Sequence, residues 1–220
     1  MNFEKALKFL KDLARNNNRD WFEKNKTRYI ESKEEFEVFV SDLLNDMIEF
    51  DDSLAGLNPK KLIFRIYRDV RFSKDKSPYK KNLSAAFSSE GKGLGTPGYY
   101  VHFQPNNESF VGIGLFQPVP DKLARIRQEI DYNFAAFKKI INKPAFKKTF
   151  GTLSTEEKLS RPPKNYDETN PAIEFIKLKS FTVGTKLTDA QVLSPGFAKD
   201  VAKIFKTMYP FIRYLNEAIN

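Results

Sequence analysis

The residues best suited to chemistry lie in one basic stretch of the chain, residues 60–81. This stretch holds nine lysine and arginine side chains and only two carboxylates, Asp69 and Asp75, so it carries +7 of the chain's net charge of +9. A positive field this concentrated favours an anionic partner, with a merely solvated basic face as the alternative interpretation. The side chains that we expect to bind an anion are Arg65, Arg68, Arg71, Lys76, Tyr79 and Lys80.

The chemistry of this stretch favours a phosphorylated or carboxylated ligand. Arginine suits such a site because its planar guanidinium binds phosphate or carboxylate through two parallel hydrogen bonds. Asp69 or Asp75 would then orient the ligand or act as a catalytic base. Residues 73–80 contain no glycine, so this loop is not a phosphate loop of the Walker type.

Arg68 stands out because it breaks the alternation of apolar and polar side chains in an expected strand, residues 62–72. It falls on the face that should be buried, and a buried guanidinium is costly unless it is paired and hydrogen-bonded. We therefore expect either a polar pocket around Arg68 or an internal staple to a carboxylate. Asp69 would point to the opposite face and pair with Arg65, Arg71 or a cross-strand residue.

His102 is the only histidine in the chain and shares a strand face with Tyr100 and Gln104. A lone histidine can act as a general base near neutral pH, which makes it a third catalytic candidate after the two aspartates. The lack of a recognisable serine or cysteine nucleophile motif favours a hydrogen-bonded structural role instead. With one histidine and no cysteine, thiol chemistry, thiolate zinc sites and histidine-rich metal sites are excluded. We expect no metal and no cofactor, since a magnesium site on Asp69 and Asp75 has only weak support.

Two glycines mark the expected strand over residues 110–117. Gly112 and Gly114 lie on one face of this strand, and glycine inside a strand often marks the close approach of another backbone or a ligand. They can form the floor of a cleft. Close packing of a helix against the sheet is the favoured interpretation.

An α+β fold must position these residues. Apolar side chains recur at helical spacing towards both ends of the chain, whereas alternating segments with short links in the middle favour an antiparallel sheet. Helices are expected over residues 3–14, 19–50 with a break near Ser32, 120–141, 144–150 and from Pro195 onwards. Strands are expected over residues 62–72, 83–87, 99–103, 110–117 and 180–187, with a hairpin turn at residues 105–107. We predict one domain, residues 1–220, with a central, mainly antiparallel sheet packed against N-terminal and C-terminal helices.

The composition is that of an ordinary globular protein. Of the 220 residues, 40% are hydrophobic and 30% charged, which excludes wholesale disorder. The longest apolar stretch, residues 110–116, is far shorter than the roughly 20 residues needed to cross a bilayer, so we expect no membrane partner. The charged N-terminus excludes a signal peptide, and with the lack of cysteine it favours a cytoplasmic location. The sequence does not predict the oligomeric state.

Four motifs together resemble one known family. They are NNxRxWF from residue 16, FRIYRDVRFSKDKSPYK at residues 64–80, PGYY at residues 97–100 and RPPK at residues 161–164. This set is similar to the bacterial and fungal family known as domain of unknown function 2461, and the resemblance covers nearly the whole chain. It implies a single-domain protein of this length and brings no activity, cofactor or substrate with it.

Three hypotheses about function remain open at this point. The first is a protein, possibly an enzyme, that binds a small anionic ligand in a basic cleft. The second is a nucleic-acid-binding module, suggested by a pI of about 9.5 and by an aromatic-basic patch on which bases can stack, although core packing of these aromatics is favoured. The members of that patch are Trp21, Phe22, Lys26 and Tyr29. The third is a non-enzymatic scaffold in which the Arg/Asp/Lys motif forms an internal ion-pair network.

Overall fold

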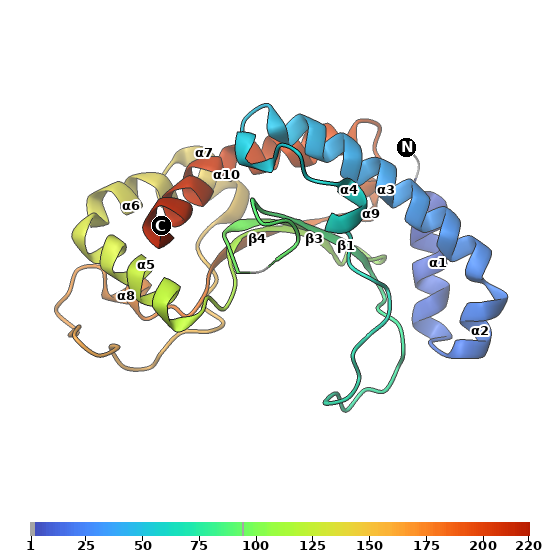
Figure 1. Ribbon diagram of the computed structural model, residues 1–220, viewed down its shortest axis with the longest axis horizontal. Coiled ribbons are helices and arrows are strands. Elements are labelled where there is room, and N and C mark those ends of the chain that lie inside the picture. The colour runs from blue at the N-terminus through green and yellow to red at the C-terminus, as the bar shows by residue number, and fades with distance from the viewer. Residues whose placement is uncertain (1–2, 94) are drawn as a thin grey trace.

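Helices cover one face of a four-stranded antiparallel sheet and flank it at both ends (Figure 1). The structure is a computed structural model that describes residues 3–93 and 95–220. The strands lie side by side in chain order: β1 (Leu83–Phe87), β2 (Gly98–Phe103), β3 (Ser109–Leu115) and β4 (Phe181–Leu187). The chain is therefore one α+β domain with an antiparallel sheet, as the sequence predicts.

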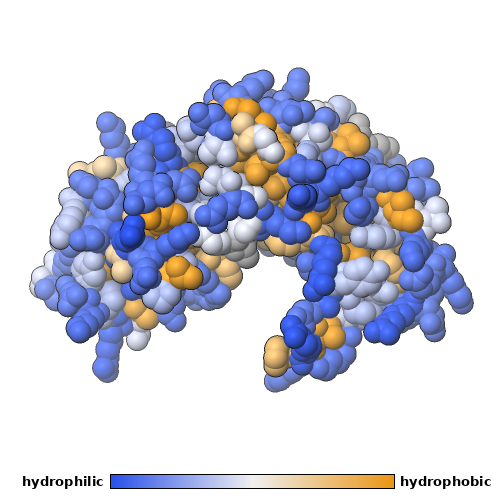
Figure 2. Space-filling view, in the orientation of Figure 1, coloured by the Kyte–Doolittle hydropathy of each residue, from blue (hydrophilic) through white to orange (hydrophobic). Residues whose placement is uncertain are grey.

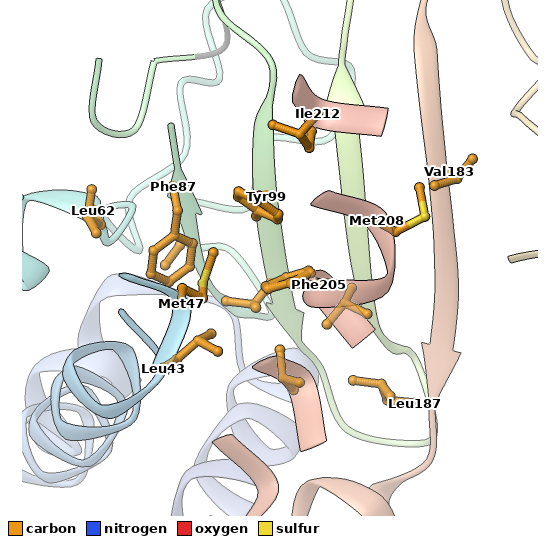
Figure 3. Packing of buried hydrophobic residues seen from close by; sticks show 14 of the residues in the cluster. Leu43, Met47, Leu62, Phe87, Tyr99, Val183, Leu187, Phe205, Met208 and Ile212 are labelled. Atoms are coloured by element: carbon orange, nitrogen blue, oxygen red, sulfur yellow. The ribbon is translucent and has the colours of Figure 1, made fainter. Parts of the chain in front are cut away.

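Two long helices build the covered side of the sheet. They are α3 (Lys26–Ile48) and α10 (Phe197–Ile219), which lie above the sheet in Figure 1. In Figure 3, Leu43 and Met47 of α3 and Phe205 of α10 point towards Phe87 and Tyr99 of the sheet. Their burial removes apolar surface from water, which is the main driving force for this packing.

Most of the remaining helices lie at the two ends of the sheet, those of residues 4–24 at one end and those of residues 120–176 at the other (Figure 1). Two short helices, α1 (Glu4–Arg15) and α2 (Arg19–Lys24), precede α3, and the 3₁₀ turn η1 (Asp52–Leu54) and α4 (Pro59–Leu62) follow it. Residues 116–180, here called the helical lobe, form α5 (Pro120–Tyr132), α6 (Phe134–Ile141), α7 (Pro144–Phe150) and α8 (Ile173–Ile176). The short helix α9 (Asp189–Val192) joins β4 to α10. None of the helices described here is long and apolar enough to cross a membrane.

The hairpin between β2 and β3 forms at the expected turn. Asn106 and Asn107 adopt left-handed backbone angles, with φ of 67° and 60°, which asparagine tolerates better than most residues. The carboxylate of Asp189 accepts hydrogen bonds from both backbone N–H groups, at 3.0 and 2.9 Å. This contact ties the turn to the start of α9.

Three helical regions differ from the prediction. The region expected over residues 120–141 is divided at Asn133 into α5 and α6. The helical region at residues 19–50 breaks at Asn25 and not near Ser32, because the buried Ser32 hydroxyl donates its hydrogen bond to the carbonyl of Arg28 within α3 and leaves that helix intact. The last helix begins at Phe197, after Gly196 in the left-handed conformation, and not at Pro195.

The strand expected over residues 62–72 is absent. After α4, only Ile63 bridges to β1, and the chain then leaves the sheet as an irregular projection, residues 63–82, here called the arm (Figure 1). The arm folds back on itself, with the N–H of Arg68 bonded to the carbonyl of Pro78 at 2.9 Å. Its alternating pattern therefore does not mark a sheet face. Phe72, which in a regular strand would share the buried face with Arg68, is 95% exposed.

Candidate functional site

The open face of the sheet, opposite α3 and α10, forms the floor of a cleft. The strand register brings together on this face the pairs Tyr100–Gly112, Gly98–Gly114 and Gly112–Gly184. The cleft has a volume of about 950 Å³, which is within the range of small-molecule sites. Figure 2 shows it as the hollow below the sheet, between the arm and the helical lobe.

Glycines make up much of this floor, here called the glycine floor: Gly98, Gly112, Gly114 and Gly184. A Cβ atom at Gly114 would lie 1.9 Å from the carbonyl oxygen of Phe181, and one at Gly98 would lie 2.4 Å from that of Phe87. These two positions therefore require glycine for close backbone approach. The helix packing favoured from the sequence for Gly112 and Gly114 is wrong, since the long helices lie on the other face and these glycines line the cleft.

The arm forms one wall of the cleft and is anchored through Tyr79. The side-chain amide of Asn17 donates to the carbonyl of Tyr79 at 2.9 Å and accepts from its N–H at 3.0 Å. The ring of Tyr79 is buried and stacks on Phe22, with the ring centroids 4.0 Å apart. Tyr79, an expected anion ligand, thus lies against the N-terminal helices, and two of the motifs identified in the sequence meet at this contact.

Neighbouring aromatics of the N-terminal helices pack in the same way. Phe22 is fully buried, and Trp21 stacks on Phe9 at a centroid distance of 6.0 Å. Tyr29 packs against Phe22 at 5.2 Å. The core packing favoured from the sequence for these aromatics is confirmed.

Arg68 lines the cleft and also holds the arm together. Its guanidinium donates to the carboxylate of Asp75 at 2.7 Å, to the hydroxyl of Ser73 at 3.2 Å, and to both the hydroxyl and the carbonyl of Ser77. The carboxylate of Asp75 accepts hydrogen bonds from the backbone N–H of Ser77, from the Ser77 hydroxyl and from Arg68. In this order of importance, they lower the pKa of Asp75 to about 2. The Arg68 side chain is 24% exposed, so the expected staple exists, but it lies within the arm and not in the core.

The other charged residues near the arm tip are also engaged. Asp69 pairs with Arg71 at 2.7 Å, one of the pairings expected from the sequence, and this hydrogen bond lowers the pKa of Asp69. The ammonium of Lys76 donates to the carbonyl of Val70 at 3.0 Å. Of these residues Asp69 lines the cleft, whereas Arg71 and Lys76 do not.

Lys80 has the most distinctive environment of the expected anion ligands. It is half-buried in the cleft wall, with its ammonium 5.2 Å from the ring centroid of Phe64. No side-chain hydrogen bond or ion pair joins it to another of the described residues. Burial, and then the like charges of Arg65 and Lys92, lower its pKa.

His102 lies on the open face beside the cleft. Its Nδ1 is 3.2 Å from the hydroxyl of Tyr100, its Nε2 is 3.2 Å from the amide oxygen of Gln104, and its ring stacks on Phe110 at 4.6 Å. Burial lowers its pKa and so favours the neutral imidazole. The expected neighbours, Tyr100 and Gln104, are its hydrogen-bond partners.

The helical lobe supplies the opposite wall. The N–H of Ser154 donates to the carbonyl of Thr182 in β4 at 2.8 Å, and the N–H of Glu156 contacts the Ser154 hydroxyl at 3.4 Å. Glu156 therefore lines the cleft on the side of β4, whereas Lys80 lines it from the arm. Sequence reasoning missed this wall, together with the cleft aromatics Phe64, Phe110 and Phe116.

The described ranges 3–93 and 95–220 contain no group of three or more histidine, aspartate or glutamate side chains arranged to hold a metal ion. The arrangement instead offers cationic groups on one wall, a carboxylate on the other and an apolar, side-chain-poor floor between them. Such a cleft suits recognition of a small polar molecule with an apolar part.

Fold and cleft together define an α+β protein with a single-layer antiparallel sheet that is open on one face. The chain belongs to the family described as Conserved hypothetical protein (DUF2461), whose model matches residues 5–214. No curated protein and no solved structure matches the chain.

Proposed function

We propose that the protein binds a small ligand carrying a phosphate or carboxylate group in the cleft, with Lys80 as the main charged contact. The observation that carries this proposal is the half-buried ammonium of Lys80, which has no acceptor among the described residues. A partly desolvated charge without a partner is unfavourable, and a bound anion offsets that cost. The nearby charges of Arg65 and Lys92, which lower the pKa of Lys80, add to the attraction for an anion.

The other arginines of the motif have a secondary role in this proposal. Arg68 and Arg71 already bond to Asp75 and Asp69, so most of their donors are used within the arm. Of the three catalytic candidates only Asp69 lines the cleft, whereas Asp75 and His102 do not, so Asp69 is the proton acceptor if the protein is an enzyme. A cytoplasmic location stays a prediction.

The test compares two adjacent lysines, Lys80→Gln and Lys81→Gln. Lys81 is exposed and does not line the cleft, so its variant is the matched control for net charge. Inorganic phosphate, sulfate, acetate and citrate are titrated at low salt while the imidazole signals of His102, the only histidine, are followed by NMR. We expect saturable shifts in the wild type and in Lys81→Gln, and at least tenfold weaker binding in Lys80→Gln. Equal affinity in both variants overturns the proposal.

A second candidate function is binding of single-stranded nucleic acid by the arm. Phe72 is 95% exposed, and the guanidinium of Arg71 lies 5.8 Å from its ring centroid. An exposed ring beside cations is a platform on which bases stack. This candidate requires that Phe72→Ala weaken binding of a single-stranded oligonucleotide and that affinity persist at physiological salt. Binding that disappears at that salt concentration is nonspecific charge attraction.

The third hypothesis is a non-enzymatic scaffold held together by an ion-pair network. The ion pairs of the motif lie within the arm. The Arg68–Asp75 and Asp69–Arg71 pairs join residues of one segment to each other. Pairs with solvent-exposed members contribute little to stability, because water and salt screen them. They therefore shape the arm without supporting the core.

A further inference from the structure

The glycine floor contains one glycine that the backbone does not require. A Cβ atom at Gly112 would meet nothing closer than the carbonyl oxygen of Val183 at 3.6 Å, an ordinary contact, and Gly112 has no positive φ angle. Gly98 and Gly114, by contrast, would clash with backbone atoms. Glycine inside a strand costs roughly 0.5–1 kcal/mol relative to alanine, so the fold alone gives no reason for glycine at position 112.

The side-chain-free area has the size of a small flat ring system. The glycines form a staggered strip in which Gly98 pairs with Gly114 and Gly112 pairs with Gly184, while Thr182 and Tyr100 occupy the third position of these two rows. Neighbouring strands are about 4.8 Å apart, so each row is bare over about 5 Å and the strip crosses the three strands diagonally. From Gly112 to Gly114 it extends about 7 Å along the strand, two residues at about 3.4 Å each. A ligand of one or two fused rings fits flat on such an area, whereas a side chain at Gly112 would stand in its way.

Aromatic residues border this floor on the side where the cation lies. Tyr100 is paired with Gly112 and has its ring 5.7 Å from Phe110 and 6.2 Å from Phe64. The ammonium of Lys80 lies against the same Phe64 ring. An aromatic ligand can therefore pack edge-to-face against these rings while its anionic group reaches Lys80.

We infer that the ligand of this cleft is a flat aromatic anion of one or two rings, an aryl carboxylate or aryl phosphate, which lies on the glycine floor with its charge at Lys80. This inference rests on the proposed function and adds the shape and chemical class of the ligand. The charges on the two walls fix its orientation, because Glu156 on the opposite wall repels the anionic end. A flat ring is the ligand shape that can lie in contact with the backbone at Gly112, where no side chain stands in its way.

The test uses pairs of anionic probes: the first pair is matched in charge and size and differs in shape, whereas the other two pairs differ by an aromatic ring system. Benzoate is compared with cyclohexanecarboxylate, 2-naphthoate with acetate, and phenyl phosphate with inorganic phosphate, by isothermal titration calorimetry at low salt. We expect each aromatic probe to bind at least tenfold more tightly than its partner in the wild type. The Gly112→Val variant should lose this preference and keep its affinity for inorganic phosphate.

The variants separate failure of the inference from failure of the proposed function. Gly112→Ala, which adds one methyl group without a backbone clash, should show an intermediate loss and a melting temperature near that of the wild type, so the test stands even if Gly112→Val folds poorly. If all the anions bind through Lys80 regardless of shape and of the Gly112 variants, the inference is overturned and the proposed function stands. If Lys80→Gln leaves aromatic binding unchanged, the role of Lys80 as anion contact fails, and if no probe binds, both fail.

Discussion

Removal of the Asn17 side chain should detach the arm from the N-terminal helices. Asn17 and Tyr79 are joined by two hydrogen bonds of 2.9 and 3.0 Å, in which one side-chain amide satisfies both the N–H and the carbonyl of a buried residue. In Asn17→Ala both backbone groups lose their partner. Because Lys80 directly follows Tyr79, the same change should displace the cation of the proposed anion site.

The expected loss of stability follows from these two bonds. A buried polar group left without its partner costs about 1–3 kcal/mol, and two such groups, partly rehydrated in the variant, give a loss of about 3 kcal/mol. For a domain of this size each kcal/mol lowers the melting temperature by about 2–4 °C, so the variant should melt about 6–12 °C below the wild type.

The assay is thermal and urea unfolding followed by circular dichroism, with Asn16→Ala as the matched control. The Asn16 amide makes one exposed hydrogen bond, to the carbonyl of Asp12 at 3.0 Å, so its removal should cost about 1 kcal/mol or less. Asn17→Asp keeps the acceptor for the N–H of Tyr79 and loses the donor, and it should fall between the two alanine variants. Equal melting temperatures for Asn16→Ala and Asn17→Ala would refute the assigned anchoring role.

Two titrations test the electrostatics of the site. The pKa of Asp75 should be about 2, because the N–H and hydroxyl of Ser77 and the guanidinium of Arg68 bind its carboxylate. The stability that this carboxylate contributes is present above pH 3.8, its usual pKa, and is lost as the pH falls towards 2. In Arg68→Ala, carbon-detected NMR should show this pKa higher but still below 3.8, and an unchanged pKa would contradict the contact. The pKa of His102 should lie below 6.5, chiefly through burial and to a smaller degree through the charge of Lys80, so its contribution to stability is lost as the pH falls below 6.5. Lys80→Gln should raise the pKa of His102 in proton NMR, and a fall would contradict the placement of the ammonium near the ring.

Elements with a strong hydrophobic period were predictable from the sequence. The strand β2 alternates between buried and half-buried residues, β1 is buried throughout, and the pattern identified all four strands to within a few residues. The prediction of a strand at residues 62–72 is wrong, because an alternating pattern shows only that every second side chain is apolar and does not show that a neighbouring strand is present. In the arm that alternation leaves Phe72 almost fully exposed, so the sheet partner that the pattern implies does not exist.

The candidate site was only partly predictable, for a different reason. The charge cluster identified Arg68, Asp69 and Lys80, which line the cleft. It could not separate them from Tyr79, whose role as an anchor depends on Asn17, a residue 62 positions away in sequence. The glycines of β3 were the signal for the floor, but the choice between helix packing and a cleft depends on which face the distant helix α10 covers.

The insertion of the helical lobe between two paired strands makes one wall of the cleft separable from the rest of it. Leu115 and Phe181 face each other at the ends of β3 and β4, so residues 116–180 leave and re-enter the sheet at one place. The loss of chain entropy on closing so long a connection costs about 2.5 kcal/mol more than closing a four-residue turn. Because this cost grows only slowly with length, further changes in the length of the connection have little effect on stability. The wall with Glu156 belongs to this insertion, whereas the floor and Lys80 belong to the rest of the chain. A change in the length of the lobe would therefore alter the part of the cleft that meets the far end of a ligand and leave the floor and Lys80 in place.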